Sequence, residues 1–163
     1  MSKHVLYQYY FLPMKPLIVL FVVFGISCLT CYIIEHDARI YLSGRIAMAV
    51  MLLFTSLGHF KFPKGMAMML PDFMPVKVTM IYVTGFIEIA AAIGLLIPST
   101  QYLIAILLIT FFIFILPSNI YGAIKQVNLE KATYDGPGLS YLWFRVPLQV
   151  LFIWWAWYFA LMH

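Results

Sequence analysis

The sequence has 163 residues, of which 64% are hydrophobic and only 10% are charged, and its mean hydropathy is +0.97. Soluble domains carry about 25% charged residues, so this composition excludes a water-soluble globule and predicts an all-α membrane protein, because helices satisfy their own backbone hydrogen bonds in lipid. The net charge of +4 comes from scattered lysines and arginines without a basic cluster, and we therefore exclude nucleic acid as a partner.

Five apolar stretches predict five transmembrane helices, at about residues 17–34, 40–60, 78–97, 102–121 and 142–162. Each has about the 20 residues that a bilayer requires, although the second is continuously apolar only over residues 46–57. The first has a basic start but no small-x-small cleavage site after it, so we expect a retained helix and not a cleaved signal peptide. No soluble domain is predicted.

Basic residues lie mostly on one side of these five spans. Eight occur on the side of the N-terminus and only two, Arg39 and Arg45, on the other. The positive-inside rule therefore predicts a cytoplasmic N-terminus and an external C-terminus. The eight are Lys3, Lys15, Lys61, Lys64, Lys77, Lys125, Lys131 and Arg145.

Two connecting segments fall on the predicted cytoplasmic side. Residues 61–77 are rich in methionine, contain three prolines and are flanked by lysines, which indicates a short helix or re-entrant turn in the membrane interface. Residues 125–140 form the only sizeable aqueous loop, with a turn predicted at the DGPG of residues 135–138.

Glu88 is the only charged residue between Lys77 and Lys125. It lies about ten residues into the third span, roughly 15 Å deep. An ionised carboxylate at that depth costs several kcal/mol unless it is paired or hydrated. Two interpretations stay open: a functional acid, or a protonated side chain that joins helices by hydrogen bonds.

Further polar residues are predicted in the same leaflet as Glu88. His59 and Asn119 lie at the cytoplasmic ends of the second and fourth spans, and Arg145 and Gln149 share one face at the start of the fifth. An interfacial histidine and a snorkelling arginine are the simpler alternatives. We predict a polar vestibule open to the cytoplasm. The assigned residues are Glu88 and His59 as catalytic groups, and Arg145, Asn119, Gln149, Asp72 and Tyr82 as ligand-binding groups.

Cys28 and Cys31 form a C-x-x-C pair near the outer end of the first span. On a helix the two thiols lie on roughly one face, which permits a redox dithiol, although cysteine also packs as a small apolar residue. The four histidines show no metal-ligand spacing, so no metal site is predicted.

Three motifs occur in the order found in DoxX-like membrane proteins. These are GHFKFPKGMAMMLPDFMPVKVTMIYVTGFIEIAAAIGLL at residues 58–96, LPSNIY at 116–121 and WFRVPLQVLFIWWAW at 143–157. The chain resembles this family over about residues 44–160, with Ser118 in place of a usual alanine. The resemblance implies a four-helix transmembrane bundle over residues 39–163, preceded by an additional helix in residues 1–38. The matching positions are His59, Pro71, Pro75, Gly85, Glu88, Pro117, Asn119, Arg145 and Gln149.

Members of the DoxX-like family have been linked to quinone-coupled sulfur oxidation and to membrane oxidoreductase complexes, and many have no established activity. We therefore expect a bacterial inner-membrane protein that binds a small amphipathic or quinone-like molecule in its polar pocket. It would act alone as a quinone-linked oxidoreductase or as the membrane subunit of a redox partner or larger complex, with no covalent cofactor. The alternative is a structural or assembly subunit without catalysis. Enzymatic activity and oligomeric state are left open.

Overall fold

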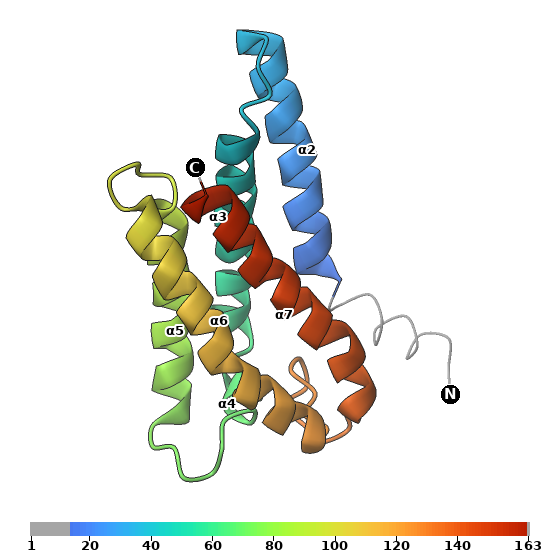
Figure 1. Ribbon diagram of the computed structural model, residues 1–163. Helices are drawn as coiled ribbons and strands as arrows, with labels where there is room; N and C mark the ends of the chain where they lie inside the picture. Colours follow the sequence, from blue (N-terminus) through green and yellow to red (C-terminus); the bar gives the residue numbers. More distant parts are fainter. Residues whose placement is uncertain (1–13, 163) are drawn as a thin grey trace.

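The computed structural model describes residues 14–162, and within them the chain is helical throughout, with turns between the helices (Figure 1). Five helical runs are long and apolar enough to cross a membrane: α2, α3, α5, α6 and the run from η1 through η2. The prediction of an all-α chain is confirmed for these residues, and five helices have the length and apolarity of the five predicted spans, as in a multi-pass membrane protein. The elements are α2 (Lys15–Glu35), α3 (Ile40–Lys61), α4 (Pro63–Ala67), α5 (Lys77–Gly94), α6 (Gln101–Ile124), the 3-10 helix η1 (Gly138–Tyr141), α7 (Leu142–Ala156) and the π-helix η2 (Trp157–Leu161).

Two helix ends differ from the sequence prediction. The third span was expected to continue to residue 97, but α5 ends at Gly94. The Thr100 hydroxyl donates to the Gly94 carbonyl at 2.8 Å, which satisfies a carbonyl that the helix leaves free at its end. α6 continues to Ile124 and is longer than predicted.

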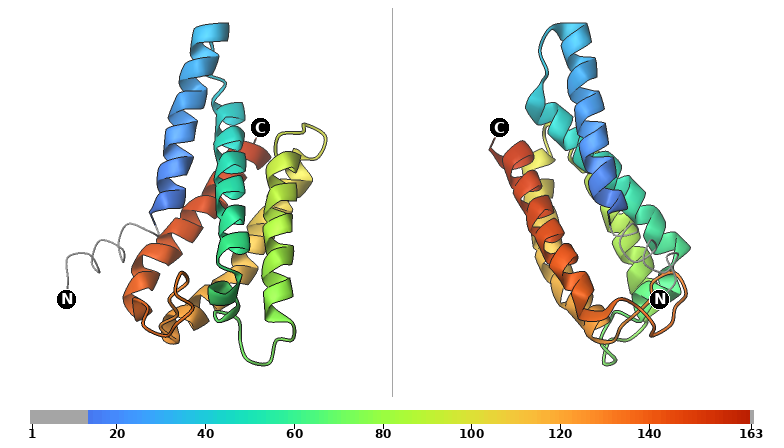
Figure 2. Two further views of the ribbon diagram at one scale, coloured as in Figure 1. Left: turned by 180° about the vertical axis from the view of Figure 1, so that it is seen from behind. Right: turned by 90° about the vertical axis from the view of Figure 1, so that its right-hand side faces the viewer.

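The long helices form two layers. α3 packs most extensively against α2 and α5, whereas α6 packs mainly against α7. Figure 2 shows α6 and α7 side by side, facing the layer of α2, α3 and α5. We call the end where α3 and α6 finish and α5 begins the lysine-rich end, after Lys61, Lys64, Lys77 and Lys125, and the opposite end the hairpin end, after the α2–α3 connection. The layers come together toward the hairpin end and separate toward the lysine-rich end.

An apolar core fills the hairpin-end half of the bundle. The indole Nε1 of Trp155 donates to the Gly44 carbonyl at 2.9 Å and so joins α7 to α3. A Cβ at Gly44 would overlap the Phe159 ring, so glycine is what lets η2 approach α3 closely. Phe24 of α2 contacts Trp155 edge-on, with ring centroids 5.1 Å apart. This half therefore leaves little room for a ligand.

The lysine-rich end is covered by α4 and by the connection between α6 and α7. A Cβ at Gly65 would overlap the Leu129 carbonyl, so α4 and this connection are in close contact. The predicted turn is present, with Gly138 at φ +68° and the Gly136 amide donating to the Gln126 carbonyl at 2.6 Å. The segment differs from a purely aqueous loop, because Val127 is buried.

Candidate functional site

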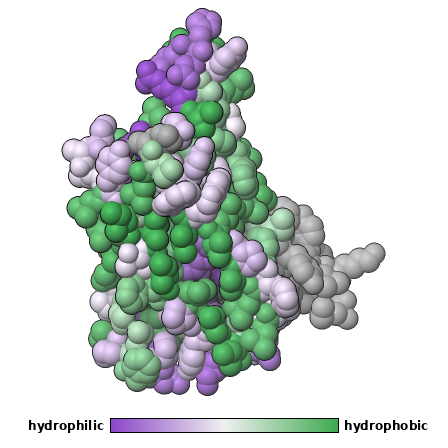
Figure 3. Space-filling model, viewed as in Figure 1, coloured by the Kyte–Doolittle hydropathy of each residue, from purple (hydrophilic) through white to green (hydrophobic). Residues whose placement is uncertain are grey.

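A cavity of about 530 Å³ lies between the two helix layers in the lysine-rich half. Cavities that bind small molecules have volumes of this order and are mostly apolar with a few converging polar groups. Its wall comes mainly from α3, α5, α6 and α7, and it also includes Met66 of α4, Leu129 of the α6–α7 connection and Lys15 of α2. Figure 3 shows a hydrophilic patch in a hollow of the otherwise hydrophobic surface, between α6 and α7.

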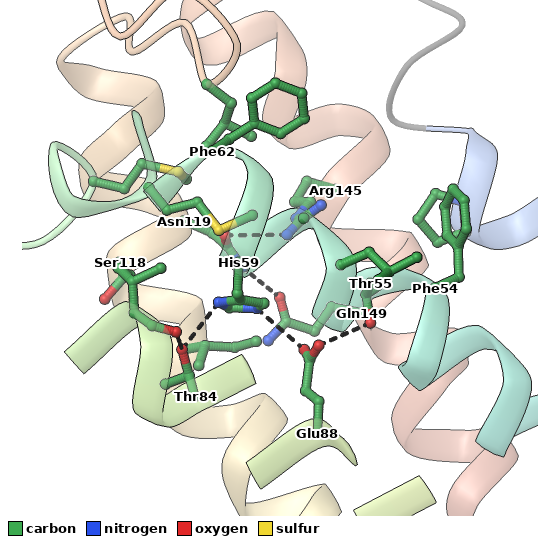
Figure 4. Close-up of a pocket in the computed structure, with 18 of the residues that line it drawn as sticks. Phe54, Thr55, His59, Phe62, Thr84, Glu88, Ser118, Asn119, Arg145 and Gln149 are labelled. Atoms are coloured by element: carbon green, nitrogen blue, oxygen red, sulfur yellow. Dashed lines mark hydrogen bonds and ion pairs between the residues drawn. The ribbon is translucent and has the colours of Figure 1, made fainter. Parts of the chain in front are cut away.

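Two threonines, a histidine and a glutamate form the deepest polar group of the cavity. Thr55 and His59 lie one turn apart on α3, and Thr84 and Glu88 lie one turn apart on α5. Thr55 Oγ1 donates to Glu88 Oε2 at 3.0 Å, and Thr84 Oγ1 lies 3.0 Å from His59 Nδ1. His59 Nε2 lies 3.4 Å from Glu88 Oε1 (Figure 4). Each threonine therefore contacts the titratable group of the other helix, and we call these four residues the crossed quartet.

A glycine permits α3 and α5 to approach at the crossed quartet. A Cβ at Gly85 would lie 2.9 Å from the Cβ of His59 and 3.2 Å from the Phe60 ring. Gly85 and Glu88 are both buried on the face of α5 that meets α3. The small residue thus brings the imidazole within reach of the carboxyl group.

The hydrogen bonds of the crossed quartet allow one proton to lie between His59 and Glu88. Thr84 Oγ1 lies 2.7 Å from the Ile81 carbonyl and 3.0 Å from His59 Nδ1; when Thr84 donates to the carbonyl, it accepts from His59 Nδ1–H. His59 Nε2 then faces Glu88 Oε1, and without a proton between them two acceptors would oppose each other. One proton on either atom satisfies the contact, as imidazolium with carboxylate or as imidazole with carboxylic acid. The pair can therefore give or take a proton inside an apolar cavity.

A second polar network joins α6 to α7. Asn119 Nδ2 donates to Gln149 Oε1 at 3.1 Å, and Gln149 Nε2 donates to the Phe112 carbonyl. Arg145 donates from Nη2 to Asn119 Oδ1 at 3.4 Å and from Nη1 to the Tyr141 hydroxyl at 3.2 Å. Asn119 and Gln149 are buried and Arg145 is partly buried. The network holds the guanidinium at the cavity wall (Figure 4).

Five of the seven residues assigned as catalytic or ligand-binding lie around this one cavity. They are His59, Glu88, Asn119, Arg145 and Gln149.

Asp72 and Tyr82 are not among the residues that line the cavity. Asp72 accepts hydrogen bonds from Lys77 Nζ at 2.9 Å and from the Tyr121 hydroxyl at 3.2 Å, and these bonds lower the pKa of its carboxyl group, Lys77 contributing most. It joins the segment before α5 to the end of α6. Tyr82 is exposed and stacks on Phe60 with ring centroids 6.0 Å apart. The structure does not bring these two residues to the cavity.

Cys28 and Cys31 lie on α2, away from the cavity lining, and both thiols are free. Cys31 Sγ lies 3.9 Å from Ser43 Oγ, in the contact between α2 and α3. A redox role for the pair stays a prediction. Among residues 14–162, no three His, Cys, Asp or Glu side chains are grouped so as to hold a metal ion.

Six polar residues of the cavity wall were not assigned to the site from the sequence: Lys15, Thr55, Lys61, Thr84, Ser118 and Glu130. A signal for the threonines was present, because each lies four residues before His59 or Glu88, on the same helical face. What the sequence did not show is that each threonine contacts the other helix.

A family model described as a domain of unknown function (DUF8561) matches residues 48–160. The matched range contains α5, α6, α7 and most of α3, and thus every member of the crossed quartet. No curated protein and no solved structure matches the chain.

Proposed function

This chain belongs to the DUF8561 family, and we propose that it binds a small amphipathic molecule in the cavity between its two helix layers. The observation that carries the proposal is the convergence of the five predicted polar side chains, from four helices, on one mostly apolar cavity of about 530 Å³. Buried polar groups are costly in a membrane, so their gathering around one space indicates a site.

Different parts of the cavity wall would bind different parts of the molecule. Phe54, Phe111 and Phe152 offer apolar surface to the body of the molecule. Arg145 and its amide network offer hydrogen-bond donors to its polar end. The proton held between His59 and Glu88 would be available to a bound group that gains or loses charge.

The finer parts of the proposal depend on the DoxX resemblance. A quinone-like ligand, a DoxX-type bundle over residues 39–163 and a redox partner or larger membrane complex follow from it. A quinone that is reduced takes up protons, and a protonatable pair beside its oxygen atoms would suit that chemistry. Location in a bacterial inner membrane follows from the resemblance as well, whereas a cytoplasmic N-terminus is supported by the distribution of basic residues.

A structural or assembly subunit is the second candidate, and one observation favours it. The crossed quartet joins α3 to α5, and the Asn119–Gln149 pair joins α6 to α7, so the buried polar groups already satisfy one another. Polar residues in membrane helices act in this way as interhelical contacts. Such a protein would need no ligand.

Native mass spectrometry of the protein in nanodiscs made directly from its own membrane tests the proposal. We expect a bound small molecule on the wild type. Ser118→Phe places a ring in the cavity, whereas Ile120→Phe, two residues further along α6, places it on the exposed surface. Loss of the molecule from Ser118→Phe and its retention by Ile120→Phe would support the site.

The two candidate functions differ in the outcome of this experiment. An empty wild-type protein that leaves the membrane with a larger complex would overturn ligand binding and favour the assembly subunit. Equal occupancy of the wild type and of Ser118→Phe would place the molecule elsewhere and would also overturn the proposal. Thermal unfolding of each variant establishes that the bundle is intact.

A further inference from the structure

We infer that the molecule bound in this cavity is an anionic amphiphile whose charged head, a carboxylate or a phosphate, pairs with Arg145. The inference rests on the proposed function, since it requires that the cavity be a binding site. It comes from the balance of charge around the cavity wall.

Cations outnumber available acids at the cavity. Lys15, Lys61 and Arg145 line it, and within residues 14–162 none of the three has a carboxylate oxygen within 4.0 Å. The sequence of residues 1–13 contains no aspartate or glutamate that could supply one. Lys61 Nζ lies 5.2 Å from the centroid of the Phe62 ring, which leaves its charge uncompensated.

Arg145 is the decisive cation, because it is partly buried whereas the two lysines are exposed. Its hydrogen bonds go to neutral oxygen atoms, the Tyr141 hydroxyl at 3.2 Å and Asn119 Oδ1 at 3.4 Å, and its Cζ lies 5.9 Å from the centroid of the neutral Tyr141 ring. These bonds orient the guanidinium without neutralising it. A partly buried guanidinium without a counter-ion is unfavourable, and an anion with two oxygen atoms can accept two parallel hydrogen bonds from it.

The two acidic residues at the cavity, Glu88 and Glu130, do not neutralise this excess of positive charge. Glu88 Oε1 lies 3.4 Å from His59 Nε2, and Glu88 Oε2 accepts from Thr55 at 3.0 Å, so both oxygen atoms of this carboxyl group have partners other than the three cations. Glu130 is exposed in the α6–α7 connection, where solvent screens its charge. The head of an anionic ligand therefore belongs at Arg145, and its apolar body among the phenylalanines.

Ten-carbon probes that differ only in the head group provide the test. Decanoate, decyl phosphate, decanol and decylamine, each with a diazirine in the chain, would be photo-crosslinked to the full chain in phosphatidylcholine nanodiscs. Mass spectrometry would map and quantify labelling of cavity residues. We expect half-maximal labelling by the two anions at concentrations at least about 10-fold lower than by decanol, and the weakest labelling by decylamine.

Arg145→Gln should raise the half-maximal concentration of the anions by about 10-fold or more and leave that of decanol unchanged. Lys125→Gln is the matched control, because it removes a positive charge at the same end of the bundle from a residue that does not line the cavity. It should leave the half-maximal concentrations of the anions and of decanol unchanged. Adding phosphatidylglycerol to the nanodiscs distinguishes two sources of the anion: competition indicates a lipid head group, and no competition indicates a free amphiphile.

Equal labelling by decanoate and decanol, or an unchanged preference in Arg145→Gln, would overturn the anionic head while leaving the binding site in place. No cavity labelling by any of the four probes would instead contradict the proposed function itself. If Arg145→Gln failed to fold, Arg145→Lys would serve, because it keeps the charge and loses the paired geometry. It should retain a preference for anions over decanol, but a smaller one.

Discussion

Gly85 is where the contact between α3 and α5 can be tested most directly. In Gly85→Ala the new Cβ would lie 2.9 Å from His59 Cβ, whereas ordinary contacts begin at 3.4 Å, so the helices must separate locally by about 0.5 Å. His59 Cβ is fixed to its backbone, and no rotamer change can move it away. The separation would also stretch the contact between His59 Nε2 and Glu88 Oε1, which is already 3.4 Å.

Two opposing contributions set the change in the free energy of unfolding of Gly85→Ala. Replacing glycine by alanine inside a helix stabilises it by about 1 kcal/mol, whereas forcing extra volume into a packed contact costs about 1–3 kcal/mol. Gly25→Ala provides the reference, because no atom lies within 4 Å of a Cβ at that position of α2. We expect Gly85→Ala to have a free energy of unfolding about 1–3 kcal/mol lower than that of Gly25→Ala.

Reversible unfolding in mixed micelles, with SDS as denaturant, measures this difference. Gly58→Ala is a useful intermediate variant, because its Cβ would meet only the flexible end of Met66 at 3.3 Å. The expected order of stability is Gly25→Ala, then Gly58→Ala, then Gly85→Ala. Equal stability of Gly25→Ala and Gly85→Ala would refute the reasoning that glycine is needed for the close approach of α3 and α5.

Three further predictions concern the crossed quartet, the segment before α5 and the orientation. Thr55→Val and Thr84→Val should each lower the free energy of unfolding by about 1 kcal/mol, since each removes one buried hydrogen bond; wild-type stability in both would contradict those bonds. In an NMR titration Asp72 should titrate below its ordinary value of 3.8, so that its stabilising contribution, present above that value, is lost as the pH falls through the lowered pKa. Lys77→Gln should raise that midpoint, and an unchanged midpoint would contradict the assigned cause. A reporter that is active only in the cytoplasm should be active in the α6–α7 connection and silent in the α2–α3 hairpin; the reverse would contradict the orientation.

Hydropathy located the membrane-crossing helices but not all of their ends. Residues 95–97 are as apolar as the helix before them, yet α5 ends at Gly94, whose carbonyl accepts from Thr100. That end is accompanied by a side-chain hydrogen bond across the following turn, which hydropathy does not describe. The contact of Gly65 with Leu129, by contrast, joins segments far apart in the sequence. No local pattern predicts that the α6–α7 connection covers the cavity.

The site was partly predictable because depth in the membrane can be counted along the chain. Counting placed Glu88 about ten residues into the third span, and the structure places it in the cavity lining. Tyr82 was assigned to the site, but it lies beside Ile81 and off the buried stripe of α5. The positions of Ile81, Gly85 and Glu88 fall on one helical face, so the periodicity could have separated Tyr82 from them. The pairing of threonines across helices needed the structure.

The crossed quartet also sets the register of two antiparallel helices. Its two threonine contacts lie one turn apart, Thr84 with His59 and Thr55 with Glu88. If α5 slid along α3 by one residue, about 1.5 Å, both contacts would be displaced at once. The four side chains thus oppose axial sliding at two points. Because all four belong to α3 and α5, this alignment needs no side chain of α6 or α7.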